Sequence, residues 1–455
     1  MAPSATNGLQ HQTPDNAPLG ALKSLADPSL FIQKAFVGNE WTEKSKSFDV
    51  WEPSTATVLG TVADCEVEDF RRAIEVAHGS QSRYFEETTA AQRGAFLRRW
   101  YDAIMANLDD LGVILSLENG KTLSEAKGEV SYAASFIAWF AEEATRAYGH
   151  TIPSSSPNAT LHTVREPVGV CGIITPWNFP AAMITRKVAP ALAAGCAVVI
   201  KPPSETPYSA LALAKLAERA GMYPGIMHVC PTKDRSASSE LATNPLVRKI
   251  SFTGSTGVGK MLANMAAGTL KKVSLELGGN APFIVFDDAN VDLAVEGAMF
   301  CKFRCSGQTC VCANRFYVQR GVVGEFTRKL VDAVETLQTG PGLDGRTTQG
   351  PLVNEAAVAK VAEHVTDAVE KGAKLEIGGS REKRAGYFFS RDVGRCSRVA
   401  RKLQVGMVGV NTGKISAAEA PFGGVKESGY GREGSLYGME DYQVVKSITI
   451  GNLDR

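Results

Sequence analysis

The sequence lacks a hydrophobic segment long enough to cross a membrane and lacks an excess of charge of either sign. Its longest apolar run, residues 188–200, is shorter than the roughly 20 residues that a spanning helix needs. Its 49 Lys and Arg residues almost balance 48 Asp and Glu residues, giving a net charge of +1. We therefore expect neither nucleic acid nor a membrane surface as a partner. Residues 1–20 contain no Lys, no Arg and no apolar core, so we predict a disordered tail without a targeting signal.

The cysteines do not form the pattern of a secreted protein. There are nine, an odd number at irregular spacing, which favours a reduced, cytoplasmic protein. Cys305, Cys310 and Cys312 lie close together, but the spacings C-x4-C and C-x-C, without a nearby histidine, do not match a zinc site. We predict no metal. The remaining alternatives are inert core thiols or one activated nucleophile, presented by the tight turn at 307–309.

A chain of 455 residues is expected to form two or three subdomains, and its pattern predicts an α/β fold. Helical spacing of apolar residues runs from 67 to 148, and an extended arm follows at 151–166. Apolar strands then alternate with helical segments, which predicts a parallel sheet with helices on its faces. Because ligands bind beyond the carboxyl ends of such strands, the polar loops that follow them are candidate site segments.

One of these loops nearly spells a P-loop. GSTGVGKM, residues 254–261, has the two glycines and Lys260 at the right spacing, but Met261 stands where a Ser or Thr would hold Mg²⁺. Two interpretations remain equally open: a helix start whose free amides face a phosphate, or a plain tight turn. A nucleotide hydrolase that uses Lys260 and Asp287 is the competing function from a different class.

One further loop and one strand carry polar residues in apolar surroundings. Trp177 and Asn178 follow a strand; a Trp there is typical of a core or rim, whereas an Asn amide is able to donate to an oxyanion. Glu276 ends the apolar strand before Gly278-Gly279. By pattern alone it fits a solvated strand face better than a buried general base with a raised pKa.

Six segments together resemble, in order and spacing, the NAD(P)-dependent aldehyde dehydrogenase superfamily. They are PWNFP (176–180), KPPSETP (201–207), FTGSTGVGK (252–260), LELGG (275–279), GQTC (307–310) and PFGGVKESGYGREG (421–434). The resemblance covers nearly all the chain past the tail. The neighbourhoods of Arg186 and of Arg304 with Cys312 are most similar to the succinate-semialdehyde dehydrogenase branch.

The resemblance implies a covalent mechanism for the oxidation of succinate semialdehyde to succinate. Cys310 would attack the aldehyde, Asn178 would stabilise the oxyanion, and Glu276 would activate water. The residues implied to bind the cofactor are Trp177, Lys201, Ser204, Gly254, Ser255 and Leu277. Those implied to hold the distal carboxylate of the substrate are Arg186, Arg304 and Ser416. The alternatives within the class are another aldehyde, such as glutarate semialdehyde, and a catalytically impaired family member.

Two expectations concern single residues. Ser204 stands where NAD-preferring relatives often carry Glu, and a serine would not repel the 2′-phosphate of NADP, so we expect NADP or NAD with NADP accepted. Cys312 lies two residues from Cys310 and is a candidate partner for a reversible, inactivating disulfide; an inert neighbour is the comparable alternative.

The chain departs from the family pattern between residues 385 and 411. Two similar runs that stand several dozen residues apart in the family are fused here at 387–389. The missing stretch normally supplies strands of the catalytic domain and the Glu that holds the nicotinamide-side ribose. We therefore predict an internal deletion near 389–390, exposed sheet edges and a poorly held nicotinamide.

The resemblance predicts three structural parts after the tail. A Rossmann-type dinucleotide-binding domain takes 21–150 and 167–278, and a shortened α/β catalytic domain takes 279–439. Residues 151–166 and 440–455 form a small β arm for oligomerisation, because the alternating apolar residues of the last strand need a partner face. We expect a homodimer or homotetramer.

Overall fold

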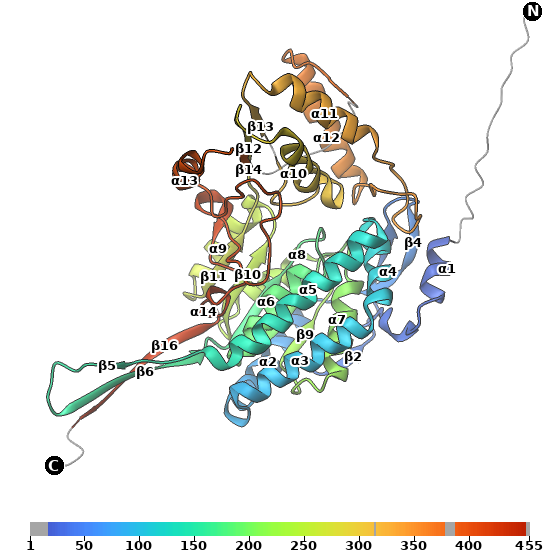
Figure 1. The fold of residues 1–455 in the computed structure, drawn as a ribbon. Coiled ribbons are helices and arrows are strands. Elements are labelled where there is room, and N and C mark those ends of the chain that lie inside the picture. Colours follow the sequence, from blue (N-terminus) through green and yellow to red (C-terminus); the bar gives the residue numbers. More distant parts are fainter. Residues whose placement is uncertain (1–16, 314, 378–386, 452–455) are drawn as a thin grey trace, which may run out of the picture.

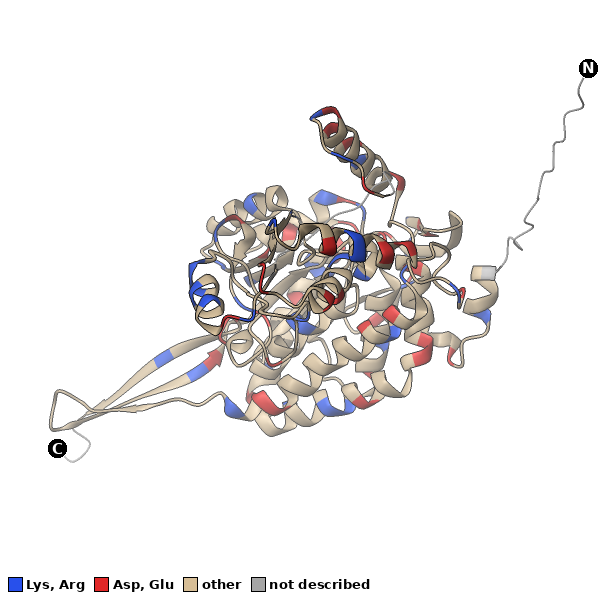
Figure 2. Ribbon diagram, turned by 45° about the horizontal axis from the view of Figure 1, so that its top comes forward, with Lys and Arg blue, Asp and Glu red and all other residues tan. Residues whose placement is uncertain are grey.

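The computed structural model describes residues 17–313, 315–377 and 387–451, which form two lobes and a projecting arm (Figure 1). Residues 1–16 of the predicted tail lie outside the described residues. The tail prediction is wrong for 17–20, because helix α1 begins at Ala17 and continues to Lys23. Lys/Arg and Asp/Glu residues are interspersed along the helices of both lobes (Figure 2), as the balanced composition suggests.

The larger lobe is built on an eight-stranded sheet with a parallel centre. From one edge to the other its strands are β15 (Gly429–Tyr430), β11 (Lys272–Glu276), β10 (Val247–Thr253), β7 (Val170–Ile174), β8 (Ala197–Lys201), β9 (Met227–Val229), β1 (Ala35–Val37) and β2 (Glu40–Thr42). The five strands from β11 to β9 are parallel, and β15, β1 and β2 pair antiparallel. A separate hairpin pairs β3 (Ser47–Glu52) with β4 (Thr57–Ala63).

Helices cover this sheet and bury the apolar strands. The helices of the lobe are α2 (Val67–Glu87), α3 (Ala90–Ala106), α4 (Leu108–Asn119), α5 (Leu123–Glu143), α6 (Ala182–Ala194), α7 (Tyr208–Arg219), α8 (Arg235–Thr243) and α9 (Thr256–Ala267). α6 is buried along its whole length between the sheet and α5, so its two cations, Arg186 and Lys187, are buried together with its apolar residues. The predicted alternation of strands and helices is confirmed.

The strand order places a topological switch point between β7 and β10. The chain runs from β7 through β8 to β9 on one side, then returns to the other side of β7 with β10 and β11. Loops that follow neighbouring strands on opposite sides of such a point leave a crevice at the carboxyl edge. The loop with Trp177 and Asn178 follows β7, and Gly254 follows β10, so both open at this crevice.

The smaller lobe has a three-stranded parallel sheet, β13 (Arg315–Val318), β12 (Pro282–Val285) and β14 (Tyr387–Phe389). Its core is aromatic: the Phe283 ring lies 4.8 Å from that of Phe316 and 5.0 Å from that of Phe389, measured between centroids. Its helices are α10 (Val291–Phe303), α11 (Val323–Glu335), α12 (Glu355–Glu370) and α13 (Val393–Lys402). β14 reaches α13 within four residues, so within the described residues this sheet ends at β14 on one edge.

The projecting arm joins two segments far apart in sequence. β16 (Gln443–Gly451) pairs antiparallel with β6 (Ala159–Pro167), and β5 (Thr151–Ile152) pairs with the other side of β6. The predicted pairing of the last strand with the arm is confirmed. The short helix α14 (Tyr437–Glu440) leads into β16.

Candidate active site

Cys310 and Glu276 line one cavity of about 800 Å³, whose walls come from both lobes. Glu276 is the last residue of β11, where the parallel sheet ends at the crevice. Cys310 follows a short 3₁₀ turn, Arg304–Gly307, in which Cys305 and Ser306 have φ near +52°. Left-handed backbone at two non-glycine residues is strained and is held by the surrounding contacts. The turn places Cys310 on the cavity wall.

Glu276 is buried, with 6% of its surface exposed, contrary to what its strand pattern alone favours. Burial raises the pKa of its carboxyl to about 8, and the nearby Glu433 carboxylate adds to the rise. Lys187 and Arg186 oppose it. These two cations both form ion pairs with Glu433, and all three groups are buried. Burial alone would raise the pKa of Glu433, but the two ion pairs hold it below the ordinary value.

The environment of Cys310 keeps its thiol protonated at neutral pH. Burial, followed by the charge of Glu276, raises the pKa of the Cys310 thiol to about 11. The positive charges of Arg186 and Arg304 act in the opposite direction. A base that removes the thiol proton would therefore be needed to generate the thiolate.

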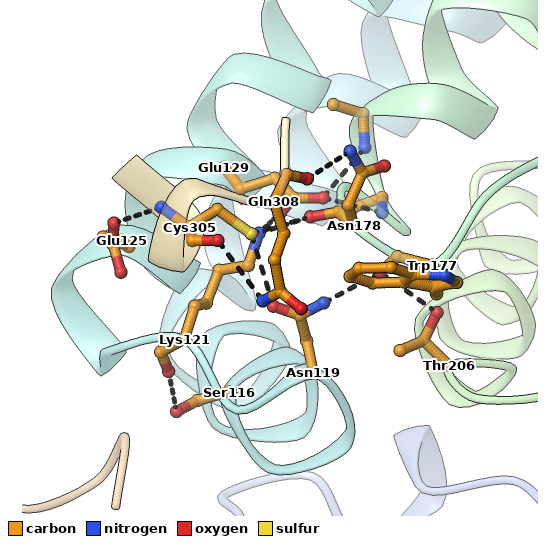
Figure 3. A network of polar contacts seen from close by, with 12 residues as sticks. Ser116, Asn119, Lys121, Glu125, Glu129, Trp177, Asn178, Thr206, Cys305 and Gln308 are labelled. Atoms are coloured by element: carbon orange, nitrogen blue, oxygen red, sulfur yellow. Dashed lines mark hydrogen bonds and ion pairs between the residues drawn. The ribbon is translucent and has the colours of Figure 1, made fainter. Parts of the chain in front are cut away.

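Asn178 is held against the cysteine loop by a network of polar contacts (Figure 3). Its Nδ2 donates to the backbone carbonyl of Gln308 over 2.7 Å. The backbone carbonyl of Asn178 accepts from Lys121 Nζ (2.8 Å) and from Cys305 Sγ (3.2 Å). The amide donor thus lies beside the segment that carries Cys310. The buried Asn178 Oδ1 has no partner among the described residues.

Sequence reasoning missed the buried ion pair of Lys121 and Glu129, which anchors this network. Both side chains are 1% exposed, and Glu129 also accepts from the backbone N–H groups of Ala181 and Ala182. The only signal was a Lys in the apolar surroundings between α4 and α5, and a charged residue at a helix end is more often solvated. The pair therefore ties α5, the β7 loop and the Cys305 turn together.

Four of the residues predicted to bind a cofactor lie around the crevice. Lys201 ends β8, and burial lowers its pKa although Glu205 and Asp64 oppose this. Ser255 caps α9 by accepting from Val258 N, and Gly254 N donates to the Glu276 carbonyl. Leu277 packs directly against Gly259, because a Cβ added at Gly259 would lie only 2.4 Å from the Cδ2 of Leu277.

Two predicted residues of the cofactor site make other contacts. The carbonyl of Trp177 accepts from Asn119 Nδ2 over 2.8 Å. Ser204 lines a different cavity of about 460 Å³, and its hydroxyl donates to Glu205.

The residues predicted to hold the far end of a substrate are not all together. Arg304 and Ser416 line a smaller cavity of about 120 Å³. Arg186 lines neither this cavity nor the one with Cys310; it is 1% exposed, pairs with Glu433 and lies 3.9 Å from the centroid of the Phe422 ring. Cys312 is buried and donates to the carbonyl of Gly307. Within the described residues, no cluster of three His, Cys, Asp or Glu side chains is arranged to hold a metal ion.

The sequence matches the aldehyde dehydrogenase family over residues 41–390 and 384–448. The chain belongs to this family. It is 49% identical to a succinate-semialdehyde dehydrogenase [NADP(+)] of Schizosaccharomyces pombe, covering 94% of this chain and 97% of the relative. It is 49% identical to a glutarate-semialdehyde dehydrogenase of Pseudomonas putida, covering 94% and 99%. The crystal structure of a succinate-semialdehyde dehydrogenase from Burkholderia pseudomallei superimposes with a TM-score of 0.92 at 48% identity, covering 94% and 100%.

The comparisons also indicate that this chain is shorter than its relative by an internal segment. The alignment with the S. pombe relative spans 485 residues although only 94% of a 455-residue chain takes part, so the relative contains residues without a counterpart here. The family model matches the chain in two separate ranges, which overlap at residues 384–390. Both findings fit the predicted internal deletion at this join.

Proposed function

We propose that this chain oxidises succinate semialdehyde to succinate with NADP as the hydride acceptor. The observation that carries the proposal is the convergence of Cys310 and Glu276 on one cavity that adjoins a cationic pocket. The names of the S. pombe and B. pseudomallei relatives support the same substrate. Glutarate semialdehyde, one carbon longer, is the second candidate, supported by the P. putida relative.

The side chains suit covalent aldehyde oxidation. The Cys310 thiol gives its proton to solvent water as its sulfur bonds to the aldehyde carbon, and the carbonyl oxygen takes up negative charge that Asn178 Nδ2 and the Cys310 backbone N–H stabilise. NADP, when bound, supplies the hydride acceptor. Loss of the aldehyde hydrogen as hydride to that acceptor would leave the acyl group bound to Cys310 as a thioester. Glu276 removes a proton from water, the water attacks the thioester carbon, and the acid leaves as the thiol is restored.

The larger lobe contains residues that suit the binding of a dinucleotide. The N-terminus of α9 follows Gly254 and Ser255, so its free N–H groups suit a pyrophosphate. Lys201 would hold the adenosine ribose, while Trp177 and Leu277 would line the site. On the nicotinamide side we assign no described residue to the ribose, because the family segment that carries the ribose-binding Glu is missing.

Replacing Ser204 with glutamate is expected to lower kcat/KM for NADP by about 100-fold and to leave that for NAD within about threefold. A carboxylate at this position would repel the 2′-phosphate, and like charges placed together cost several kcal/mol. Initial rates with each cofactor measure the effect, and Glu205→Gln serves as the matched control. An unchanged NADP rate in the Ser204→Glu variant would contradict this assignment.

Restoring the missing segment from a close relative between residues 389 and 390 is expected to raise kcat about 100-fold. Misplacing reacting groups by about an ångström costs on this order, and the segment supplies sheet and ribose contacts. Turnover at saturating NADP and succinate semialdehyde compares the two chains. Equal kcat values would mean that this chain positions the nicotinamide without the segment. They would refute the alternative that the chain is a catalytically impaired family member.

The arm and the thiols support proposals on assembly and location. β16 and β5 form the two edges of the three-stranded arm, and such edges pair with a second copy, so we propose a homodimer or homotetramer. All nine cysteines are free thiols, which suits the cytoplasm. No helix in the described part of the chain is long and apolar enough to cross a membrane.

The direct test measures NADPH formation by the full chain with succinate semialdehyde, and ATP turnover without aldehyde. We expect the first and not the second, since Lys260 pairs with Glu427 at the surface and Met261 offers Mg²⁺ no oxygen ligand. ATP hydrolysis without aldehyde oxidation would overturn the proposal.

The predicted disulfide between Cys310 and Cys312 is tested by treating the parent and a Cys312→Ala variant with peroxide and measuring how much activity a thiol reductant restores. Equally reversible inhibition of both proteins would refute the prediction.

A further inference from the structure

The smaller cavity beside the candidate active site continues the path that a substrate would follow from Cys310. It shares Val311 and Ile415 with the larger cavity, and Thr309 also lines it. Its volume of about 120 Å³ accommodates a small terminal group. An aldehyde bound to Cys310 would therefore direct its far end toward this pocket.

Two cations converge on this pocket around one aromatic ring. The Arg304 guanidinium carbon lies 5.5 Å and the Lys414 Nζ 5.4 Å from the centroid of the Phe300 ring, and all three residues line the cavity. Within residues 17–313, 315–377 and 387–451, neither cation has a carboxylate at ion-pair distance, in contrast to Arg186, which Glu433 neutralises. The pocket thus carries two uncompensated positive charges, together with the Ser416 hydroxyl.

We propose that Lys414 is a specificity-determining residue that, with Arg304, forms a two-cation pocket favouring aldehydes with an anionic far end, a dianion more strongly than a single carboxylate. This inference rests on the proposed function, because it concerns the same substrate site. A succinate-like monoanion satisfies Arg304 alone, in a planar fork-to-fork pairing. A phosphonate dianion has three oxygens and a second charge, which matches Lys414 and Ser416 as well.

The expected contribution of Lys414 is moderate because its side chain is exposed. Solvent and salt screen an exposed charge, so its effect should depend on the charge of the substrate and shrink in high salt. A purely structural role for Lys414 would affect charged and neutral aldehydes alike. This difference makes the charge of the substrate the decisive variable.

The kinetic experiment compares butanal, succinate semialdehyde and 3-phosphonopropanal, at about pH 8.5 where the phosphonate is a dianion. Lys414→Met is expected to lower kcat/KM about tenfold for the phosphonate, about threefold for the carboxylate and less than twofold for butanal. Lys402→Met, which removes an exposed charge of α13 outside both cavities, serves as the control. Equal losses for all three aldehydes, or none, would overturn the proposal.

A second measurement needs neither cofactor nor turnover. Succinate and 3-phosphonopropionate should protect Cys310 from iodoacetamide, and Lys414→Met should raise the half-protecting concentration about tenfold for the phosphonate but only about threefold for succinate. Equal shifts, or no shift, would refute the role of Lys414. If protection depends on Lys414 as expected but the parent oxidises none of the aldehydes, the proposed function fails while the anion pocket stands.

Discussion

Replacing Cys310 with serine should lower aldehyde oxidation by about 10⁴-fold or more. A serine hydroxyl is a much weaker acid and a poorer nucleophile than a thiol, and loss of a covalent nucleophile typically costs on this order or more. NADPH formation with succinate semialdehyde measures the loss. The parent thiol should also react with iodoacetamide faster as pH rises toward 11, because burial and Glu276 raise its pKa to about 11.

The control for this prediction is Cys396→Ser, which changes a half-exposed cysteine on α13 and should retain full activity. Thermal unfolding of both variants separates a chemical defect from misfolding. If Cys310→Ser folded normally and kept even a tenth of the parent activity, another nucleophile would have to be sought.

Changing Glu276 to glutamine should reduce turnover about 10²- to 10⁴-fold, the range that one general base supplies. In the parent, the rate of thioester hydrolysis should rise with pH and level off above about pH 8, since Glu276 acts only when ionised and its pKa is raised to about 8. The variant should lose this rise. The rate measured from pH 6 to pH 9.5 at saturating substrate tests both statements.

The stability of the same variant gives a second readout with the opposite sign. The Glu276 carboxyl ordinarily titrates near 4.5 but holds its proton to about pH 8 in the folded chain. The folded state therefore binds more protons than the unfolded state in this window, and the parent should become less stable as pH rises through it. Glu276→Gln should lack that loss. A variant that is both inactive and less stable at pH 8 would mean that Glu276 acts structurally.

Much of the architecture was predictable because local patterns determine it. The apolar runs of β7, β8 and β10 are bounded by polar loops, and the alternation in β16 required a partner strand, which β6 provides. The family motifs then placed Cys310, Asn178 and Glu276 by position. The break at 387–389 was also visible in the sequence, because two similar runs are fused there.

Other features depend on contacts that no local pattern contains. The strand of Glu276 fits a solvated face, yet tertiary packing buries the carboxyl near Lys187 and Glu433. Arg186 was predicted to hold the substrate carboxylate with Arg304, but Glu433, 247 positions later in the chain, forms an ion pair with it. No sequence motif marks Lys414, which lies in a loop, and only its position over the Phe300 ring places it in the anion pocket.

The amino-acid sequence by itself determined the family, the order of strands and helices along the chain and the candidate reactive residues, since these follow from residue type and spacing. Only the tertiary structure decided which charges are buried, which cations are neutralised and which remain open to a substrate. The physical reason is that burial and ion pairing arise between residues brought together by folding over hundreds of positions, and both set the free energy of a charge far more strongly than its neighbours in sequence do.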